Sequence, residues 1–342
     1  GHTAEHCIGP ETTVVDATGL YAAPGLFDTH VHIESSMVGP AEYARAVVPH
    51  GTVGIYADPH EVANVCGLEG VRAMWEDAAR TPHKTMLTTP SCVPAVLGVE
   101  DTGSSIDASQ VAESMRWDSV VALGEMMNFP GILSCEQNAL NEVRETLKAD
   151  RVVTGHYVAA DDDRGLSAYI AAGVTSCHES GSFTDVISKL RMGMYVQLRQ
   201  GSAWLNLPGY LPELVASGVD TSHCLLCTDD SHPHTLVDDG HMDRVLREAV
   251  RLGLDPVTAL QMATINAAQY FGVGRDMGSI TPGKCADIVL LRDLERFEAK
   301  AVYIDGTLAA EDGKATFATK PFTWPAFMTH TMNLGVDITP RA

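Results

Sequence analysis

Residues 24–32 read Pro-Gly-Leu-Phe-Asp-Thr-His-Val-His, and this segment decides the fold. A largely apolar run that begins at Gly25 ends in two histidines, His30 and His32, which are separated by one residue. In a β-strand, side chains at i and i+2 point to the same face and lie about 6.6 Å apart. Both imidazoles can therefore reach one metal ion at about 2.1 Å. Packed cores also contain such pairs, so this pair alone does not decide between a metal site and a structural role.

Seven further segments rich in Val, Ile, Leu and Thr follow and alternate with amphipathic stretches. The expected strands are residues 25–32, 52–58, 85–91, 120–125, 151–156, 174–178, 194–199 and 224–229, and the helices between them include 40–49, 68–79, 136–149, 164–172 and 212–217. This alternation predicts an α/β fold with a parallel sheet, and eight repeats predict a closed (β/α)8 TIM-type barrel. An open doubly wound sheet is the alternative. Polar residues at nearly every strand end favour the barrel, because those ends then meet at one mouth.

The alternation of strands and helices ends after the eighth expected strand. The expected elements are helices 242–252 and 256–271, then strands 286–291 and 301–306, with residues 12–20 pairing with these strands. The predicted organisation is a small flanking β-sandwich module at residues 1–22 and 279–318, a barrel at 23–278, and the start of a C-terminal region at 319–342.

Composition limits the classes of function. The chain has 342 residues and a formal net charge of −21, which repels nucleic acid over most of the surface. No segment approaches the about 18 consecutive apolar residues of a membrane span. The N-terminus lacks the basic and then apolar order of a signal peptide, and the eight cysteines lack the spacing of a disulfide framework. We expect a cytoplasmic protein that binds neither nucleic acid nor a membrane.

Residues that bind metal ions recur at the expected strand ends. The six candidate ligands are His30, His32, Glu125, His156, His178 and Asp229. Six donors are more than one divalent ion uses, whereas two ions with a bridging carboxylate would satisfy them. Either His156 or His178 alone could be a hydrogen-bonded core histidine. Glu125 is harder to explain otherwise, because a carboxylate buried without a cation costs several kcal/mol. The pattern therefore favours a binuclear metal site.

Several motifs carry a family resemblance. Residues 24–32 resemble the metal-binding opening of the amidohydrolase superfamily, and residues 278–289 are similar to the strand that re-enters its β-sandwich. Within that superfamily, residues 22–313 resemble the adenine deaminases of bacteria and archaea. The motifs are His32-Ile33-Glu34-Ser35-Ser36-Met37, Asp58-Pro59-His60-Glu61, Ser91-Cys92-Val93-Pro94-Ala95, Gly124-Glu125-Met126-Met127, Cys177-His178-Glu179-Ser180 and Cys227-Thr228-Asp229-Asp230.

The resemblance implies two divalent metal ions per chain. It assigns His30 and His32 to one ion, His156 and His178 to the other, Glu125 to a bridge between them, and Asp229 to metal binding and proton transfer. Manganese is the metal that the resemblance suggests, and Fe²⁺ or Zn²⁺ would suit the same nitrogen and oxygen ligands.

The implied reaction is hydrolytic deamination of adenine to hypoxanthine and ammonia. A hydroxide held between the ions would attack C6 of the purine, and Asp229 would pass the proton to the departing amine. Protonation of the ring falls to Glu179, Glu61 or Asp58. The candidate catalytic residues are Asp229, Glu125, Glu179 and His178, and the candidate substrate contacts are Asp58, His60, Glu61, Arg199 and Ser202.

Other functions fit parts of the pattern. A cyclic amide hydrolase such as a hydantoinase would use a similar metal pair, as would a related purine or pterin aminohydrolase, and an assay of adenine against hydantoins separates the first of these. A barrel that serves only as a binding scaffold would have no reason to keep six ligands. The enzyme is expected to be a homo-oligomer.

The sequence departs from the adenine deaminase pattern at both ends. Only 29 residues precede His30, fewer than the strands that the family places there would need, and the chain stops soon after Pro325, where the family continues into a further domain. The resemblance therefore predicts a partial chain, with an incomplete β-sandwich module whose strand edges are unpaired.

Overall fold

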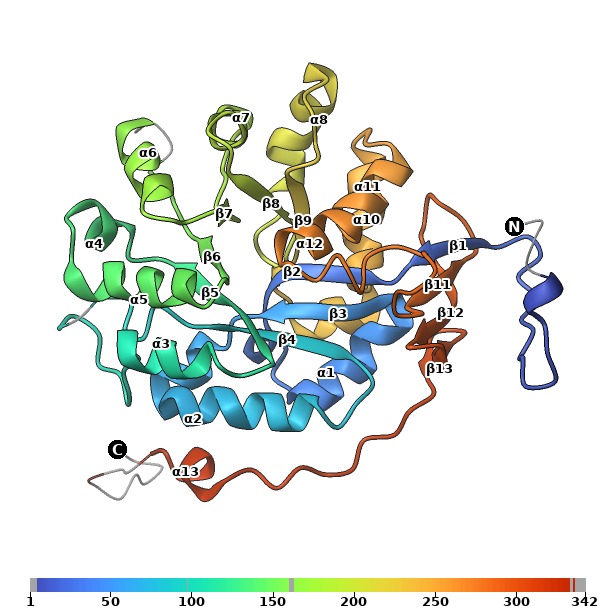
Figure 1. Ribbon diagram of the computed structural model, residues 1–342, viewed down its shortest axis with the longest axis horizontal. Helices are drawn as coiled ribbons and strands as arrows, with labels where there is room; N and C mark the ends of the chain where they lie inside the picture. Colours follow the sequence, from blue (N-terminus) through green and yellow to red (C-terminus); the bar gives the residue numbers. More distant parts are fainter. Residues whose placement is uncertain (1–4, 97, 160–162, 333–334, 336–342) are drawn as a thin grey trace, which may run out of the picture.

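Eight parallel strands form the centre of the protein. The computed structural model describes residues 5–96, 98–159, 163–332 and 335. The strands are β2 (Leu26–His32), β3 (Thr52–Ala57), β4 (Lys84–Thr89), β5 (Val120–Met126), β6 (Val152–Gly155), β7 (Ser176–Cys177), β8 (Tyr195–Arg199) and β9 (Cys224–Cys227). Each lies within two residues of an expected strand at either end. Helices surround these strands in Figure 1.

The strands form a closed ring. Strands β2 to β6 pair in order as one parallel ladder, and β7 to β9 pair as a second. A parallel bridge between Val153 and Val174 joins the ladders at one end. At the other end, β10 (Asp229–Asp230), which follows β9 directly, pairs in parallel with Val31 and His32 of β2. The predicted barrel class is confirmed, and the open sheet is excluded.

Helices and 3-10 turns connect the strands. The helices are α1 (Pro40–Val47), α2 (His60–Ala78), α3 (Ala108–Ser114), α4 (Phe129–Leu133), α5 (Gln137–Lys148), α6 (Asp163–Ala171), α7 (Phe183–Arg191), α8 (Leu207–Ser217), α9 (Pro233–Asp238), α10 (Met242–Arg251), α11 (Pro256–Met262), α12 (Ile265–Tyr270) and α13 (Ala326–Thr329), with the turns η1 (Glu5–Cys7), η2 (Ile33–Ser36) and η3 (Val48–His50). The long helices bury one apolar side against the barrel, which is the usual source of helix stability in a domain.

Three expected helices differ from those observed. The predicted helix 212–217 is the second half of α8, which begins at Leu207. Residues 256–271 form two helices, because the chain turns at Thr264 with φ −134° and ψ −89°. The turn exposes the carbonyl of Ala263, which accepts a hydrogen bond of 2.7 Å from the backbone N–H of Phe27 in β2. The predicted helix 68–79 is the second half of α2, which begins at His60 and is interrupted at Gly67 with φ 63° and ψ −159°.

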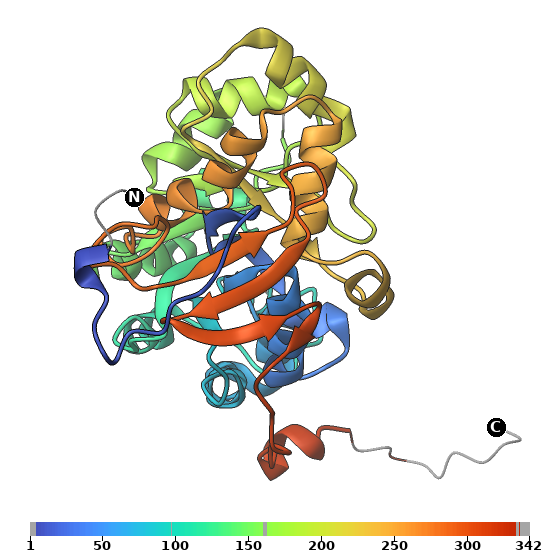
Figure 2. The same ribbon diagram turned by 90° about the vertical axis from the view of Figure 1, so that its right-hand side faces the viewer.

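A five-stranded antiparallel sheet flanks the barrel. Its order is β1 (Tyr21–Pro24), β11 (Ile288–Leu291), β12 (Ala299–Ile304), β13 (Thr307–Glu311) and β14 (Lys314–Ala315). Figure 2 shows this sheet lying across one side of the molecule. The expectation that residues 12–20 pair with it is wrong, because the pairing strand is β1. The predicted domain bounds stay predictions, and residues 1–4, 333–334 and 336–342 lie outside the described residues.

Within the described ranges, no helix combines the length and the apolar character needed to cross a bilayer.

Candidate active site

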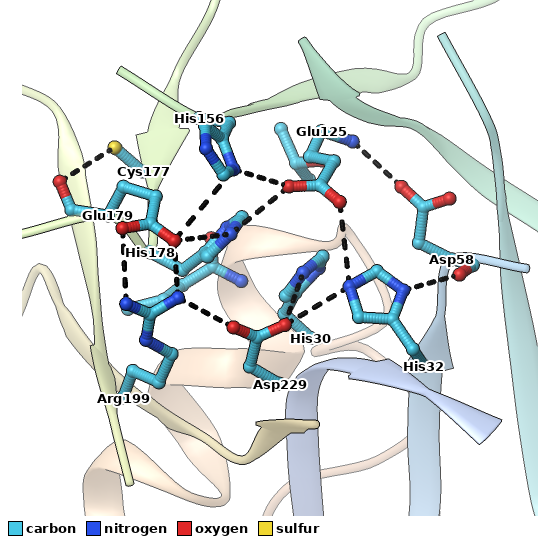
Figure 3. Close-up of polar contacts among 12 residues, drawn as sticks. His30, His32, Asp58, Glu125, His156, Cys177, His178, Glu179, Arg199 and Asp229 are labelled. Atoms are coloured by element: carbon cyan, nitrogen blue, oxygen red, sulfur yellow. Dashed lines mark hydrogen bonds and ion pairs between the residues drawn. The ribbon is translucent and has the colours of Figure 1, made fainter. Parts of the chain in front are cut away.

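The six predicted metal ligands lie together at the carboxyl ends of the barrel strands. Figure 3 shows their side chains pointing toward one another. Five of them, all except His30, line a cavity of about 370 Å³. Its lining residues are His32, His60, Glu61, Glu125, Met127, His156, His178, Glu179, Arg199, Trp204, Asp229 and Asp230. The parallel order of the strands brings residues as far apart in the sequence as His30 and Asp229 into one site.

Glu125 in β5 lies at the centre of this group, with 2% of its surface exposed. Its Oε1 atom is 3.2 Å from His60 Nδ1 and 3.5 Å from His32 Nε2. Its Oε2 atom is 2.6 Å from His156 Nδ1 and 3.2 Å from His178 Nε2. Burial favours the neutral acid, but hydrogen bonds from the surrounding imidazoles hold the pKa of Glu125 well below its usual range. Its two oxygens therefore face two different pairs of nitrogen donors.

Asp229 lies opposite Glu125, between two of the histidines and the guanidinium of Arg199. Its Oδ1 atom is 3.1 Å from His32 Nε2 and 3.6 Å from His30 Nε2. Its Oδ2 atom accepts a hydrogen bond of 2.6 Å from Arg199 Nη1, and the same guanidinium forms a two-pronged ion pair with Glu179. Burial favours the neutral acid, yet the neighbouring imidazoles lower the pKa of Asp229. The carboxylate is therefore held ionised.

His30 and His32 each direct their Nε2 atom toward Asp229. His32 Nδ1 donates a hydrogen bond of 2.8 Å to the carbonyl of Asp58, which can only accept, so in the neutral ring the lone pair lies on Nε2. The buried His30 Nε2 has no hydrogen-bond partner among the described residues. Burial and the nearby His178 lower the pKa of His30 well below its usual range, so the ring is neutral. Neutral imidazole is the form that binds metal ions.

The donor atoms fit divalent metal ions. Four overlapping groups of three ligands have donor atoms within 4.8 Å of one another. They are His30, His32 and Asp229; His30, Glu125 and His178; His32, His60 and Glu125; and His156, His178 and Glu179. Imidazole nitrogen and carboxylate oxygen are suitable ligands for Mn²⁺, Fe²⁺ and Zn²⁺. An unpartnered, buried imidazole nitrogen next to ionised carboxylates is satisfied when a cation binds.

A second cluster of possible metal ligands lies beside β11 and β12 of the flanking sheet, and it already contains a positive charge. Cys285, Asp287 and Asp305 also bring donor atoms within 4.8 Å of one another. The ammonium of Lys84 already lies between the two carboxylates, at 2.7 Å from both oxygens of Asp287 and 2.8 Å from Asp305 Oδ1. A lysine therefore supplies the positive charge in this group.

The predicted substrate contacts divide into two sets. His60, Glu61 and Arg199 line the cavity, whereas Asp58 and Ser202 are not among its lining residues. Asp58 is fully buried, and its Oδ2 accepts a hydrogen bond of 2.9 Å from the backbone N–H of Glu125. The Ser202 hydroxyl oxygen accepts one of 2.7 Å from the backbone N–H of His232. Both side chains thus hold the walls of the site, and their contact with substrate stays a prediction.

Three lining residues were not predicted from the sequence, namely Met127, Trp204 and Asp230. Met127 follows Glu125 by two positions, so the alternation of side chains along a strand could have indicated it. Trp204 lies two positions after Ser202 in a loop, where no such period applies.

A buried lysine holds the loops that follow β6 and β7. Lys189 of α7 is fully buried. Its ammonium donates hydrogen bonds to the carbonyls of Tyr157 and Glu179, at 3.2 Å for Tyr157. It also lies 3.1 Å from the Ser180 hydroxyl and 3.1 Å from the buried carboxylate of Asp185. The charge therefore connects the residues next to His156 and His178.

Lys189→Met is expected to lower the free energy of unfolding by about 3–5 kcal/mol, because it leaves the Asp185 carboxylate buried without its partner. Urea denaturation measures this difference. Lys148→Met is the matched control, because Lys148 is 62% exposed and pairs with Glu145 on the surface of α5. The control should cost less than about 1 kcal/mol. Equal unfolding midpoints for the two variants would contradict the role of Lys189.

Comparison with known proteins identifies relatives of the whole chain. Adenine deaminase from Clostridium botulinum (strain Loch Maree / Type A3) is 52% identical over 339 residues, which are 99% of this chain and 57% of that protein. Adenine deaminase from Roseobacter denitrificans is 45% identical over 337 residues, which are 98% of this chain and 56% of that protein. The chain thus spans a little over half the length of these curated relatives.

Solved structures share the fold at low sequence identity. A β-aspartyl dipeptidase from Fervidobacterium islandicum AW-1 has a TM-score of 0.64 and 18% identity, covering 93% of this chain and 91% of that one. E. coli guanine deaminase has a TM-score of 0.60 and 15% identity, covering 91% and 88%. The model of the amidohydrolase family matches residues 21–309. With the barrel and its cluster of histidines and carboxylates, this match shows that the chain belongs to the amidohydrolase family.

Proposed function

We propose that the protein containing this chain deaminates adenine to hypoxanthine and ammonia. The observation that carries the proposal is the position of Glu125, whose oxygens face two pairs of imidazoles beside an ionised Asp229. A site of this kind suits hydrolysis with metal assistance. The choice of adenine is supported by relatives that are named adenine deaminase and are 44–52% identical to this chain.

We infer that the site binds two divalent ions. Mn²⁺ is the favoured metal, and Fe²⁺ and Zn²⁺ are alternatives. The ligands would be His30 and His32 for one ion, His156 and His178 for the other, Glu125 between them, and Asp229 next to the first pair. When bound, such ions act as Lewis acids and ionise water near neutral pH. The side chains of the cavity would bind the substrate and transfer protons.

Asp229 is the proposed proton carrier. Its Oδ1 atom lies near His30 and His32, while Arg199 holds Oδ2 and fixes the direction of the carboxylate. The ion pair of Arg199 with Glu179 keeps a second carboxylate at the same wall, within reach of a bound heterocycle. Glu61, with a side chain 41% exposed, lies at the opposite wall beside His32. We propose that Glu179 or Glu61 protonates the purine ring.

Purified chain reconstituted with Mn²⁺ is expected to release ammonia from adenine and not to open hydantoin. Removal of the metal with a chelator should reduce ammonia release to the background rate, and added Mn²⁺ should restore it, because a catalytic metal supplies several kcal/mol of barrier lowering. The measurements are ammonia release and metal content per chain. Hydantoin opening without adenine turnover would replace this proposal by a cyclic amide hydrolase.

The homo-oligomeric state and the cytoplasmic location stay predictions. Size-exclusion chromatography with light scattering measures the first, and cell fractionation measures the second.

A further inference from the structure

The loop after β8 presents one aromatic side chain to the cavity on a fixed backbone. The N–H of Gly201 donates to the carbonyl of Trp204 at 3.0 Å, which closes the loop on itself. The N–H of Ser202 donates to the carbonyl of Asp230 at 2.9 Å, which ties the loop to the neighbouring strand end. On the other side, Arg244 Nη2 donates to the carbonyl of Gly201 at 3.1 Å. These bonds hold the backbone on both sides of the indole.

The indole of Trp204 is the only aromatic carbocycle in the described lining of the cavity, and 57% of the residue is exposed. The guanidinium carbon of Arg199 lies 5.5 Å from the centre of the ring, within the range of a cation–π contact. Arg199 is itself held by Asp229 and Glu179, so it cannot leave the ring without breaking two ion pairs. Arg199 thus contacts the indole, and the exposed part of the residue faces solvent and the cavity.

An exposed indole above ionised groups is suited to a flat aromatic ligand. Nucleobases stack on tryptophan, since every base has a π-face, and the contact removes apolar surface from water on both partners. A non-aromatic ring such as hydantoin gains less from this contact. The other lining residues are ionisable, apart from Met127, and would contact the edge of such a ligand.

We propose that Trp204 is the stacking face that selects a purine ring over non-aromatic cyclic amides. The proposal rests on the proposed function, which it extends by naming the residue that recognises the plane of the base. Trp204 binds substrate and product alike, so its removal weakens binding of both.

The test compares Trp204→Ala and Trp204→Phe in the full chain reconstituted with Mn²⁺. Calorimetry gives the Kd of hypoxanthine, a product that is not turned over, and tryptophan fluorescence reports contact with the ring. Trp204→Ala should bind hypoxanthine about 5–150-fold more weakly, the range typical for loss of one base stack. Trp204→Phe should stay within about 5-fold of the unsubstituted chain, because phenylalanine also stacks. Trp75→Phe is the control, because Trp75 lies on α2 outside the cavity and is 38% exposed.

The outcomes separate the stacking proposal from the proposed function. Hypoxanthine should quench the fluorescence of the unsubstituted chain and of Trp75→Phe, and this quenching should disappear in Trp204→Phe. Equal Kd values for Trp204→Ala and the unsubstituted chain overturn the proposal, as does equal weakening in the Ala and Phe variants with metal content unchanged. If hypoxanthine binds and quenches but adenine releases no ammonia, the proposed function fails while the stacking face remains. If no purine binds, both fail.

Discussion

Glu125→Gln is expected to abolish measurable deamination and to reduce the metal bound per chain. The glutamine has the same shape but carries no charge, and one end of its carboxamide presents N–H groups to imidazoles that now face a carboxylate oxygen. It cannot join two cations as a carboxylate does. Because a catalytic metal supplies several kcal/mol of barrier lowering, the rate should fall by about 10³-fold or more. Ammonia release and metal analysis of the same sample measure both effects.

Glu113→Gln is the matched control for this substitution. Glu113 lies on α3 with a side chain 55% exposed, and its partner Arg72 is 3.6 Å away on the surface. This variant should keep its metal and its activity. A Glu125→Gln protein with full metal content and unchanged turnover would show that the carboxylate does not hold the ions.

The barrel strands and the ends that carry the metal ligands could be predicted because both follow from local chemistry. A parallel strand buried on both faces is a continuous apolar run, and a charged residue at its end is conspicuous. Glu125 after the run that begins at Val120 is the clearest case. The order of the strands in a barrel then places all these ends at one mouth, so no contact between distant residues had to be guessed.

The loop residues could not be predicted in the same way. Ser202 and Trp204 lie two positions apart. Which of them faces the cavity depends on hydrogen bonds that Ser202 makes with Asp230, at the next strand end, and with His232 just after it. The break between α11 and α12 likewise depends on Phe27, more than 200 residues earlier, whose N–H requires the carbonyl of Ala263. A sequence pattern records neither contact, since each involves backbone groups that every residue carries.

The backbone of Asp229 decides which substitution tests its side chain. Its φ is 62°, in the left-handed region, which asparagine and aspartate tolerate better than other residues with a side chain. Alanine would remove the carboxylate and add backbone strain, so its effect would mix two causes. Asparagine keeps the conformation and the size. Asp150→Asn is the matched control, because Asp150 also has a positive φ, of 56°, and is exposed in the turn that follows α5.

Asp229→Asn is expected to retain most of the metal and to lose turnover by about 10²–10⁴-fold, the contribution typical of a general acid–base group. The carboxamide oxygen can still face His30 and His32, and Glu125 with the other imidazoles is unchanged, so the ions keep most of their ligands. A carboxamide cannot accept and return a proton near neutral pH, so the step that needs one slows. Metal content, the Kd of hypoxanthine and kcat measured on one preparation separate these effects. Full activity in Asp229→Asn would assign proton transfer to another group, with Glu179, which shares Arg199 with Asp229, as the first residue to substitute next.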